Sequence, residues 1–329
     1  MSSESIFESP TITDEDICRA SRLLDLPVDA FYGSAGADPR QEVLKCMDSI
    51  DVAACPGSGK TTLLIAKLAI LAEKWKHNTR GICVLSHTNA ARHEIEKHLS
   101  NTAAGQRLLS YPHYIGTIHG FVNEFLAVPW LRSRGYTIKM IDTDVCHRRR
   151  WKSLPFKIRR ALEQNNFGPS LLSVKTPDFG IGQVRWGRGG QLGANTPTYC
   201  NIRNVCRNSS VDGYFCYDEM FMWAGELMDT TPVVIDVLRD RFPILLIDEA
   251  QDNSKEQSEI LGRIFLKGDD AVIRQRFGDA NQAIFDFQGA KEAETDKFPG
   301  SCKIDLPNSY RFGQTIADMA DPLGLEPYG

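Results

Sequence analysis

The chain has 329 residues, of which 42% are hydrophobic and 24% charged, a composition typical of a globular protein of about two domains. Its sequence has no apolar run approaching the ~18 residues of a membrane-spanning helix, and its polar, acidic N-terminus is unlike a signal peptide, which excludes a membrane partner. The cysteines number nine, an odd count without the spacing of a disulfide framework, and this favours the reducing cytoplasm.

The net charge of −4 conceals one strongly basic segment. From Ala127 to Ser210 the sequence holds 15 Lys and Arg against 4 Asp and Glu, so the remainder of the chain is markedly acidic. An acidic protein with a basic block is expected to meet an anionic partner at that block.

We expect residues 1–36 to form an N-terminal extension. It should contain a short helix, because Thr13 and Asp16 have the spacing of a capping box and an apolar helical face follows them. A second helix is expected to open at Gln41, ahead of the first strand. A glutamine amide can donate to a ring nitrogen of adenine and accept from its amino group. A plain surface glutamine explains the residue equally well at this point.

The sequence ACPGSGKTT, residues 54–62, is the feature around which the chain is organised. It lies between a strand-like apolar run, Ile50 to Cys55, and a helical one, Leu63 to Leu71. Glycines at 57 and 59 let successive backbone N–H groups point inward at phosphate oxygens, and the helix that begins at about Lys60 adds its positive end. This pattern predicts a nucleotide-binding loop.

Within this loop we expect the Lys60 ammonium to reach the β- and γ-phosphates and the Thr61 hydroxyl to complete a Mg²⁺ shell. The general pattern has glycine where this chain has Ala54. The predicted nucleotide-binding residues of the loop are Pro56, Gly57, Ser58, Gly59, Lys60, Thr61 and Thr62.

Two further strands are predicted at Gly81 to Ser86 and at Tyr114 to Thr117, each followed by a helical pattern. Residues at the carboxyl ends of such strands lie on the ligand face of an α/β sheet. His119, just after the second strand, could touch a ligand there or satisfy the backbone.

The densest part of the basic block is HRRRWKSLPFKIRR, His147 to Arg160, in which Trp151 and Phe156 are interleaved with the cations. Lys and Arg neutralise phosphates, and aromatic rings stack on unpaired bases, so the segment predicts contact with nucleic acid. A second patch at 184–191 repeats this mixture. The alternative is a solvated cationic face whose aromatic residues belong to a small core.

Cysteines near this block invite a zinc interpretation, but the gap between Cys200 and Cys206 fits no usual ligand pair, and buried or idle thiols are favoured. The residues concerned are Cys146, His147, Cys200, Cys206 and Cys216.

An adjacent carboxylate pair follows a predicted central strand, Ile244 to Ile247, in the sequence FPILLIDEAQD. ATP hydrolysis needs such a pair: Asp248 would hold Mg²⁺ through water, and Glu249 would polarise the attacking water. The alternative is that both residues cap the next helix.

The last predicted strand, Ala271 to Phe277, ends in GDANQAIFDFQGA. We expect Gln282 to sense the γ-phosphate and Phe285 and Phe287 to face a base or the core. Further on, a tyrosine ring and a guanidinium stand side by side at positions 310 and 311, a combination suited to a purine and a phosphate.

In this order, the blocks resemble those of the UvrD/Rep type of superfamily 1 DNA helicases. The family's phosphate loop is similar to A-x-x-G-x-G-K-T, so Ala54 fits it, although Cys55-Pro56 replaces a usual Gly-Ala. The resemblance covers residues ~37 to ~321. It implies an α/β fold, a RecA-like P-loop NTPase parallel sheet with an inserted, mainly helical accessory subdomain, and ATP and Mg²⁺ as cofactors.

The resemblance also implies roles at the nucleotide. Gln41 corresponds to the family's adenine-reading glutamine, Tyr310 to its adenine-stacking tyrosine and Gln251 to a residue that links ATP to the DNA side. Catalytic roles fall to Lys60, Asp248, Glu249, Gln282 as reader of the γ-phosphate and Arg311 as its arginine.

On the DNA side, the resemblance implies contacts from two strand ends, made by His87, Thr88, Asn89, Thr117 and His119. Besides Cys55-Pro56, the chain departs from the family at three further positions. His87 stands where an aromatic residue usually stacks on a base, Ala90 replaces a usual lysine, and Gln288 replaces a usual arginine.

The implied ATP-binding lobe consists of residues 37–125 and 236–329, and the inserted basic subdomain of residues 126–235. The DNA-binding residues expected in the insertion are Arg148, Arg149, Arg150 and Trp151. No second set of blocks for another RecA-like lobe is found, so such a lobe is expected to come from a missing part of the chain or from another subunit.

The sequence thus predicts the ATP-binding lobe of a DNA helicase that couples ATP hydrolysis to movement on single-stranded or partly duplex DNA and to unwinding. The chain alone is expected to bind ATP but to hydrolyse it slowly. UvrD-like proteins of similar length also occur beside a nuclease in anti-phage systems such as Gabija. The alternative is therefore a nucleotide- and DNA-sensing subunit that regulates a nuclease without unwinding.

Overall fold

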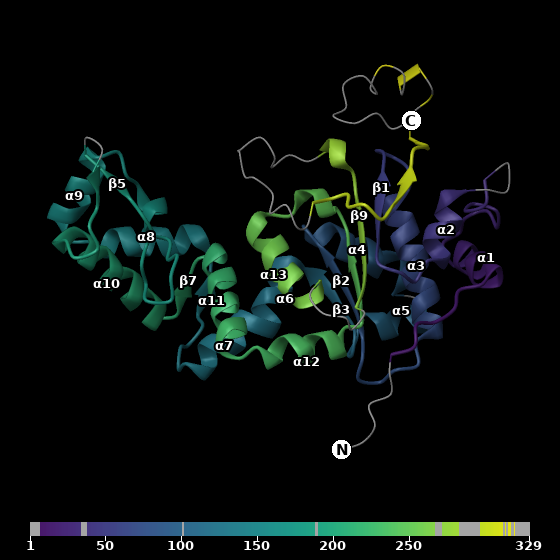
Figure 1. Cartoon of the computed structure of the whole chain (residues 1–329), viewed down its shortest axis with the longest axis horizontal. Helices are drawn as coiled ribbons and strands as arrows, with labels where there is room; N and C mark the ends of the chain where they lie inside the picture. The colour runs from purple at the N-terminus through teal and green to yellow at the C-terminus, as the bar shows by residue number, and fades with distance from the viewer. Residues whose placement is uncertain are drawn as a thin grey trace. The chain divides into compact units, whose positions relative to one another are not determined.

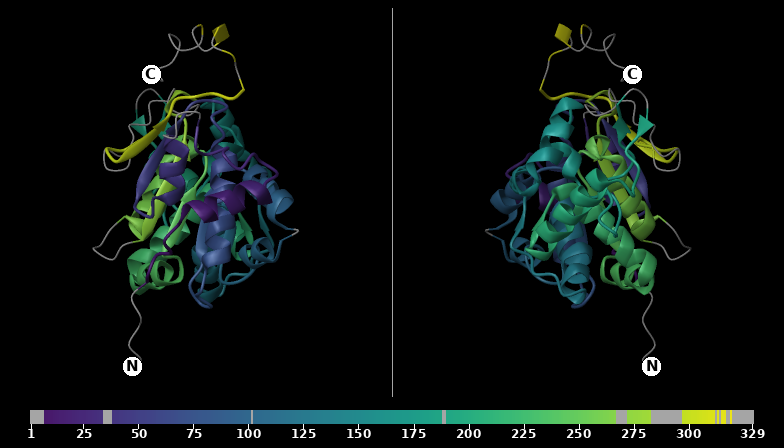
Figure 2. Two further views of the ribbon diagram at one scale, coloured as in Figure 1. Left: turned by 90° about the vertical axis from the view of Figure 1, so that its right-hand side faces the viewer. Right: turned by 90° about the vertical axis from the view of Figure 1, so that its left-hand side faces the viewer.

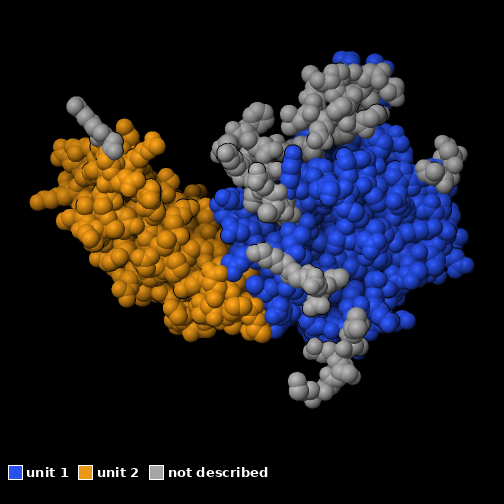
Figure 3. All heavy atoms as spheres, viewed as in Figure 1, with its two compact units in different colours: residues 1–118, 235–329 blue, residues 119–234 orange. Residues whose placement is uncertain are grey.

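The computed structural model describes residues 7–33, 38–100, 102–187, 190–266, 272–282 and 297–311, with positions 313, 315, 316 and 319. The chain forms two compact units, residues 1–118 with 235–329 (unit 1) and residues 119–234 (unit 2), coloured separately in Figure 3. Unit 2 is thus an insertion in unit 1. The sequence predicts an insertion at 126–235, whereas unit 2 begins at His119 and ends at Val234.

Unit 1 contains a parallel sheet that has six strands within the described residues, in the order β10-β1-β9-β8-β2-β3 (Figure 1). Every pairing in it is parallel. The strands are β1 (Ile50–Ala54), β2 (Ile82–Ser86), β3 (Tyr114–Thr117), β8 (Ile244–Ile247), β9 (Ile273–Gly278) and β10 (Lys303–Leu306). The continuous apolar runs of β2 and β8 are buried along their whole length, as a sheet covered on both faces requires. The predicted RecA-like parallel sheet is confirmed.

Helices cover both faces of this sheet. In Figure 1, α13 lies on one side of the strands and α1, α2 and α3 on the other. The helical elements of this unit are α1 (Asp14–Leu23), α2 (Pro39–Lys45), α3 (Lys60–Lys74), α4 (Asn89–Leu99), α5 (Ala103–Leu108), α12 (Val233–Arg241, whose first residues belong to unit 2), η3 (Ala250–Asp252), α13 (Lys255–Phe265) and η4 (Ala280–Gln282).

The N-terminal segment is part of the same core. The predicted capping box of α1 is present, since Thr13 N donates to Asp16 Oδ2 at 2.7 Å and Thr13 Oγ1 accepts from Asp16 N at 3.4 Å. Ile17 and Ala20 of α1 belong to the hydrophobic cluster that includes Leu64 and Leu68 of α3. Figure 2, left, shows α1 crossing in front of α3.

Unit 2 is mainly helical, as predicted. Its helical elements are α6 (Ile118–Val122, whose first residue belongs to unit 1), the π-helical turn η1 (Asn123–Ala127), α7 (Val128–Ser133), α8 (Thr143–Ser153), α9 (Phe156–Gln164), η2 (Pro169–Leu172), α10 (Pro197–Val211) and α11 (Tyr217–Thr230). Two short ribbons complete it: β4 (Met140–Ile141) pairs with β7 (Tyr214–Phe215), and β5 (Arg185–Trp186) with β6 (Gly190–Gln191). None of the helices in the described parts of the chain is long and apolar enough to cross a membrane.

Candidate nucleotide site and nucleic-acid surface

The predicted nucleotide residues are brought to one edge of the sheet. Because all six strands are parallel, their carboxyl ends lie along the same edge. The loop after β1, the carboxylates after β8, the segment after β9 and the segment after β10 therefore meet there. Two contacts between them show this: Cys55 N donates to Leu306 O at 3.1 Å, and Lys60 Nζ lies 3.1 Å from Glu249 Oε2.

The phosphate loop depends on two glycines in the left-handed region, Gly57 at φ 79° and Gly59 at φ 88°. A Cβ at Gly57 would lie 2.5 Å from Arg311 Cβ, so both space and backbone conformation require glycine. Gly59 is the N-cap of the 15-residue helix α3 and, having no side chain, cannot itself cap the first N–H groups of that helix. The loop therefore has the form of an anion-binding helix N-terminus.

Ser58 supplies an independent indication of a ligand in this loop. Its side chain is buried, with 1% of the residue exposed, and its Oγ has no hydrogen-bond partner among the residues that the structure describes. Buried hydroxyl groups are rarely left unsatisfied in proteins. Phosphate oxygens of a nucleotide would satisfy this one, so the loop fits the triphosphate that its sequence predicts.

The two carboxylates after β8 have different surroundings. Asp248 is 4% exposed, and burial raises the pKa of its carboxyl to about 6, with the neighbouring Glu249 adding to the effect. Glu249 is half-buried and has a left-handed backbone, with φ 51° and ψ 49°. Such a conformation is strained for a residue with a Cβ and is found preferentially at functional sites.

Glu249 connects the phosphate loop to the end of β9. Its Oε2 lies 3.1 Å from Lys60 Nζ and accepts from Gln251 Nε2 at 2.9 Å. Gln251 Oε1 in turn accepts from Asp279 N at 3.0 Å. The predicted lysine, general base and linking glutamine therefore form one continuous network.

The donor set for Mg²⁺ also fits. Thr61 offers a hydroxyl in the first turn of α3. Asp248 offers a buried carboxylate, and its raised pKa indicates that the groups around it do not fully stabilise its negative charge. Hard oxygen ligands of this kind suit a hydrated magnesium ion that is shared with phosphates.

The segment after β10 lies directly on the phosphate loop. Tyr310 N donates to Gly57 O at 2.9 Å, and Ser309 Oγ donates to Pro56 O at 2.8 Å. The Tyr310 ring is 64% exposed, and the Arg40 guanidinium lies 4.4 Å from its centroid. Through these contacts, Tyr310 links the start of α2 to the phosphate loop.

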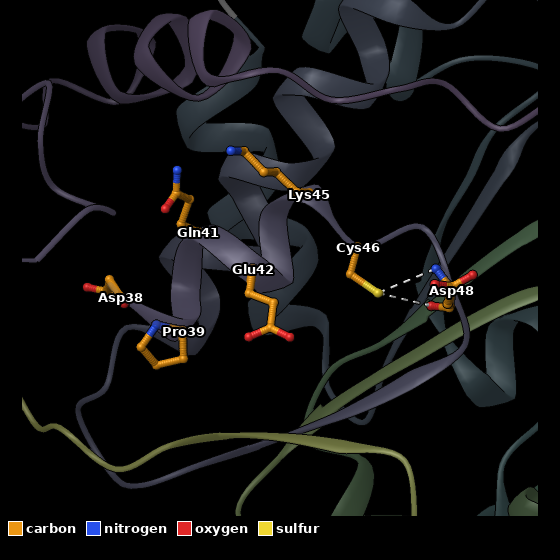
Figure 4. A pocket seen from close by; sticks show the side chains of 7 residues that line it. All are labelled: Asp38, Pro39, Gln41, Glu42, Lys45, Cys46 and Asp48. Carbon is orange, nitrogen blue, oxygen red and sulfur yellow. Dashed lines mark hydrogen bonds between the residues drawn. The ribbon is translucent and has the colours of Figure 1, made fainter. Parts of the chain in front are cut away.

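On α2, Gln41 is held by the N-terminal helix, because its Nε2 donates to Asp14 Oδ1 at 2.7 Å. A hollow runs along this helix (Figure 4) and is lined by Asp38, Pro39, Gln41, Glu42, Lys45, Cys46 and Asp48. Sequence reasoning gave no sign of the contact with Asp14, which joins residues 27 positions apart.

The remaining nucleotide residue, Gln282, is exposed in η4, and its backbone N donates to Asp279 O at 3.0 Å. The sequence places Phe285 and Phe287 near a base or in the core and Gln288 in place of a usual arginine, but these three positions lie outside the described residues.

The predicted DNA-contacting residues of unit 1 lie at the same sheet edge, beside the nucleotide elements. Thr88 and Asn89 follow β2 and are exposed, His87 is half-buried, and Thr117 is the last residue of β3. Since β2 and β3 are the last two strands of the sheet order, these residues follow the carboxylates of β8 along the edge. His119 belongs to unit 2, where its ring packs edge-on against Phe221 at 4.8 Å.

In unit 2, the DNA-binding prediction for Arg150 is wrong. Its side chain is 0% exposed and forms an ion pair with Glu219, which is equally buried. Arg150 NH1 also donates to Leu172 O at 2.6 Å, and Glu219 accepts from Val174 N at 2.7 Å and Cys216 N at 3.0 Å. The guanidinium therefore holds the interior of unit 2 together and cannot reach a phosphate.

The neighbours of Arg150 on α8 have other positions. Arg149 is exposed but paired with Asp212 at 2.7 Å, and its guanidinium lies 4.3 Å from the Tyr214 ring centroid. Trp151 is half-buried, whereas Arg148 is exposed. The exposed residues of α8 and α9 that could meet nucleic acid, called here the α8–α9 group, are Arg148, Lys152, Phe156, Lys157 and Arg160.

The buried ion pair also bears on the cysteines. Ligand atoms of Cys146, Cys216 and Glu219 lie within 4.8 Å of one another, a grouping that sequence spacing did not reveal. However, Arg150 NH1 bonds to Glu219 and lies 3.7 Å from Cys216 Sγ. The guanidinium already supplies the positive charge that a metal would bring, so the grouping is a structural ion pair lined by thiols.

Comparisons with known proteins show which proteins this chain resembles in sequence. The model of the UvrD/REP helicase N-terminal domain matches residues 36–303. Similar proteins include the ATP-dependent DNA helicase srs2 of Schizosaccharomyces pombe, 25% identical over 82% of this chain and 32% of the relative. DNA helicase II of Salmonella typhimurium is 24% identical over 91% and 41%, and the ATP-dependent DNA helicase PcrA of Staphylococcus aureus 23% over 81% and 36%. The chain thus spans between 32% and 41% of the length of these relatives.

Proposed function

The chain belongs to the UvrD/REP helicase N-terminal domain family, and from this premise we propose that it is the ATP-binding and ATP-hydrolysing lobe of a DNA motor. The observation that carries the proposal is the contact of 3.1 Å between Lys60 Nζ, at the end of the phosphate loop, and Glu249 Oε2. It brings the predicted phosphate-binding lysine and the predicted general base, 189 positions apart, into one site.

The geometry suggests how the site responds to ATP. Triphosphate oxygens offer Lys60 more negative charge than one carboxylate does, so Lys60 turns from Glu249 to the phosphates. Glu249 then keeps Gln251 as its partner and is free to orient and polarise the attacking water. Mg²⁺, held by Thr61 and Asp248, would neutralise part of the phosphate charge. Arg311, beside Gly57, lies close enough to the loop to assist there.

The network from Glu249 through Gln251 to Asp279 connects the hydrolytic site to the end of β9. We propose that DNA binds along the same edge at Thr88, Asn89 and Thr117, with the α8–α9 group as a second contact. Phe156 of that group is 66% exposed, as a residue that stacks on an unpaired base must be.

Movement along single-stranded DNA and duplex unwinding need a second lobe that closes on the bound ATP and opens after hydrolysis. We propose that such a lobe completes the motor and contributes a further arginine at the γ-phosphate, an addition worth about 10³ to 10⁵ in turnover in other NTPases. By itself, this lobe then binds ATP and hydrolyses it slowly. The regulatory alternative with a nuclease partner has no support among these relatives, whose names describe helicases.

The proposal is tested by ATP hydrolysis with and without single-stranded DNA, in the parent chain and in Glu249→Gln. We expect DNA to stimulate hydrolysis in the parent and Glu249→Gln to abolish turnover while ATP still binds. Glu259→Gln is the matched control, because Glu259 is an exposed glutamate on α13. Equal turnover in Glu249→Gln and Glu259→Gln would exclude Glu249 as the general base.

A further inference from the structure

We propose that Asp14, in the N-terminal helix α1, is a positioning residue that fixes the orientation of the Gln41 amide and thereby makes the nucleotide site prefer adenine to guanine. The inference rests on the proposed ATP site. It concerns a residue outside the part of the chain that the family model matches, residues 36–303.

Three donors converge on the Asp14 carboxylate. Its Oδ1 accepts from Gln41 Nε2 at 2.7 Å, from Lys45 Nζ at 2.8 Å and from the Tyr32 hydroxyl at 3.1 Å. Gln41 and Lys45 lie one turn apart on α2, and Figure 4 shows the Gln41 amide and the Lys45 ammonium on the same side of that helix. The carboxylate is thus held against α2 although it is 60% exposed.

The helix that carries Asp14 is itself fixed. Its Asp16 carboxylate pairs with Lys74 Nζ of α3 at 2.7 Å, and Ile17 is completely buried. Asp14 therefore has a defined position relative to α2 and α3. Its hydrogen bond to Gln41 Nε2 fixes the Gln41 side chain in turn.

The chemistry of that bond determines which way the amide points. An ionised carboxylate can only accept hydrogen bonds, and Lys45 and Gln41 hold the pKa of Asp14 below its usual value, so the group is ionised at neutral pH. Gln41 must therefore direct its NH₂ group at Asp14. Its Oε1 consequently points away from Asp14, and one amide hydrogen remains for a second acceptor.

An amide held in this way distinguishes the two purines. Adenine presents an amino group, which can donate to Oε1, whereas guanine presents a carbonyl oxygen at the same ring position. Two oxygens facing each other leave both without a donor, and an unsatisfied pair of this kind is costly. A freely rotating amide would instead turn its NH₂ group to guanine and discriminate little.

Gln41 lies at the base end of the site rather than at the phosphates. Its neighbour Arg40 places its guanidinium 4.4 Å from the Tyr310 ring centroid, and Tyr310 N bonds to Gly57 O of the phosphate loop at 2.9 Å. The predicted base-stacking ring thus lies between Gln41's helix and the loop. A base that stacks on Tyr310 would have α2 beside it.

The test compares equilibrium binding of Mg·ATP and Mg·GTP to the parent chain, Asp14→Asn and Gln41→Ala. Asparagine preserves the shape of Asp14 but can present either oxygen or NH₂, so it no longer dictates the Gln41 orientation. We expect the preference for ATP over GTP to fall about fivefold in Asp14→Asn, the factor that one net hydrogen bond contributes, and at least as much in Gln41→Ala.

Tyr32→Phe is the control for a purely structural role. It removes another hydrogen bond to Asp14 in the same segment but leaves the carboxylate facing Gln41. We expect Tyr32→Phe to keep the parent ATP-to-GTP ratio. If Asp14 only fastened α1, the two variants would change thermal stability alike and neither would change the ratio.

A parental ratio in Asp14→Asn, or a parent chain without preference for ATP, would overturn the inference. Nucleotide binding by Lys60→Ala shows whether such a result contradicts the role of Asp14 or the proposed ATP site itself. Loss of both nucleotides in Lys60→Ala with an unchanged ratio in Asp14→Asn contradicts only the role of Asp14. Undiminished binding in Lys60→Ala contradicts the proposed site itself.

Discussion

Each unit of the molecule contains a basic side chain paired with a glutamate far away in the sequence, and the two pairs differ in burial. In unit 1, Lys60 is paired with Glu249, and their side chains are 9% and 39% exposed. In unit 2, Arg150 is paired with Glu219, and both side chains are 0% exposed. The first pair lies at a sheet edge where a ligand can enter, whereas the second is enclosed by the helices of its own unit.

This difference separates an exchangeable pair from a fixed one. Lys60 can leave Glu249 for phosphates, because Glu249 keeps Gln251 and solvent as partners. Arg150 cannot exchange its partner in this way, because separating it from Glu219 would leave two unpaired charges in the interior of unit 2. Both residues looked functional in the sequence, but only Lys60, the first residue of α3, lies at the edge of the sheet where we propose that the nucleotide binds.

The largest expected effect tests the fixed pair. Replacing Glu219 with alanine leaves the buried Arg150 charge without its partner, so we expect the free energy of unfolding to fall by about 3–5 kcal/mol. Asp212→Ala is the matched control, because it breaks the exposed pair with Arg149 and should cost at most about 1 kcal/mol. Chemical denaturation measures both, and equal losses would show that burial does not distinguish the pairs.

A second prediction concerns the cations of unit 2 that remain exposed. Replacing Arg148, Lys152 and Lys157 with glutamine should weaken binding to single-stranded DNA without altering nucleotide affinity. Each lost phosphate contact should flatten the dependence of log affinity on log salt by about 0.7. Lys255→Gln, at an exposed lysine of α13, is the control. A salt dependence as steep as that of the parent would mean that α8 and α9 face away from DNA.

The smallest expected effect concerns a half-buried histidine, His113, that stays neutral in the folded chain. His113 Nδ1 accepts from Ile82 N at 3.0 Å, and burial lowers its pKa from 6.5 to about 4. As the pH falls from 6.5 towards 4, the unfolded chain binds this proton and the folded chain does not, so stability decreases over that window. His113→Gln retains an acceptor for Ile82 and should flatten the decrease. Parallel pH profiles of unfolding free energy for parent and variant would contradict the assignment.

These comparisons explain what the sequence could predict. The phosphate loop was recognisable because Gly57, Gly59 and Lys60 act through local backbone geometry, which a short stretch of sequence determines. The strands β2 and β8 were recognisable because burial on both faces demands continuous apolar runs. The position of Asp248 and Glu249 followed from the carboxyl end of such a strand.

Other features depend on contacts between distant segments and leave no local pattern. The burial of Arg150 is decided by Glu219, 69 positions later, and an RRR sequence reads the same on a surface as in an interior. The contact of Asp14 with Gln41 arises only when α1 packs against α3. The left-handed backbone of Glu249 was likewise invisible, because the sequence only shows that a strand ends there.

The exchangeable Lys60–Glu249 pair is tested most directly by equilibrium binding of Mg·ATP to Lys60→Ala and Glu249→Gln. Removing Lys60 should weaken binding by about a hundredfold, the factor expected for one lost hydrogen bond to a charged group. Replacing Glu249 with glutamine should leave binding at least as tight as in the parent, because Lys60 no longer has a charged competitor for the phosphates. Unchanged affinity in Lys60→Ala, or weaker binding in Glu249→Gln, would contradict the account.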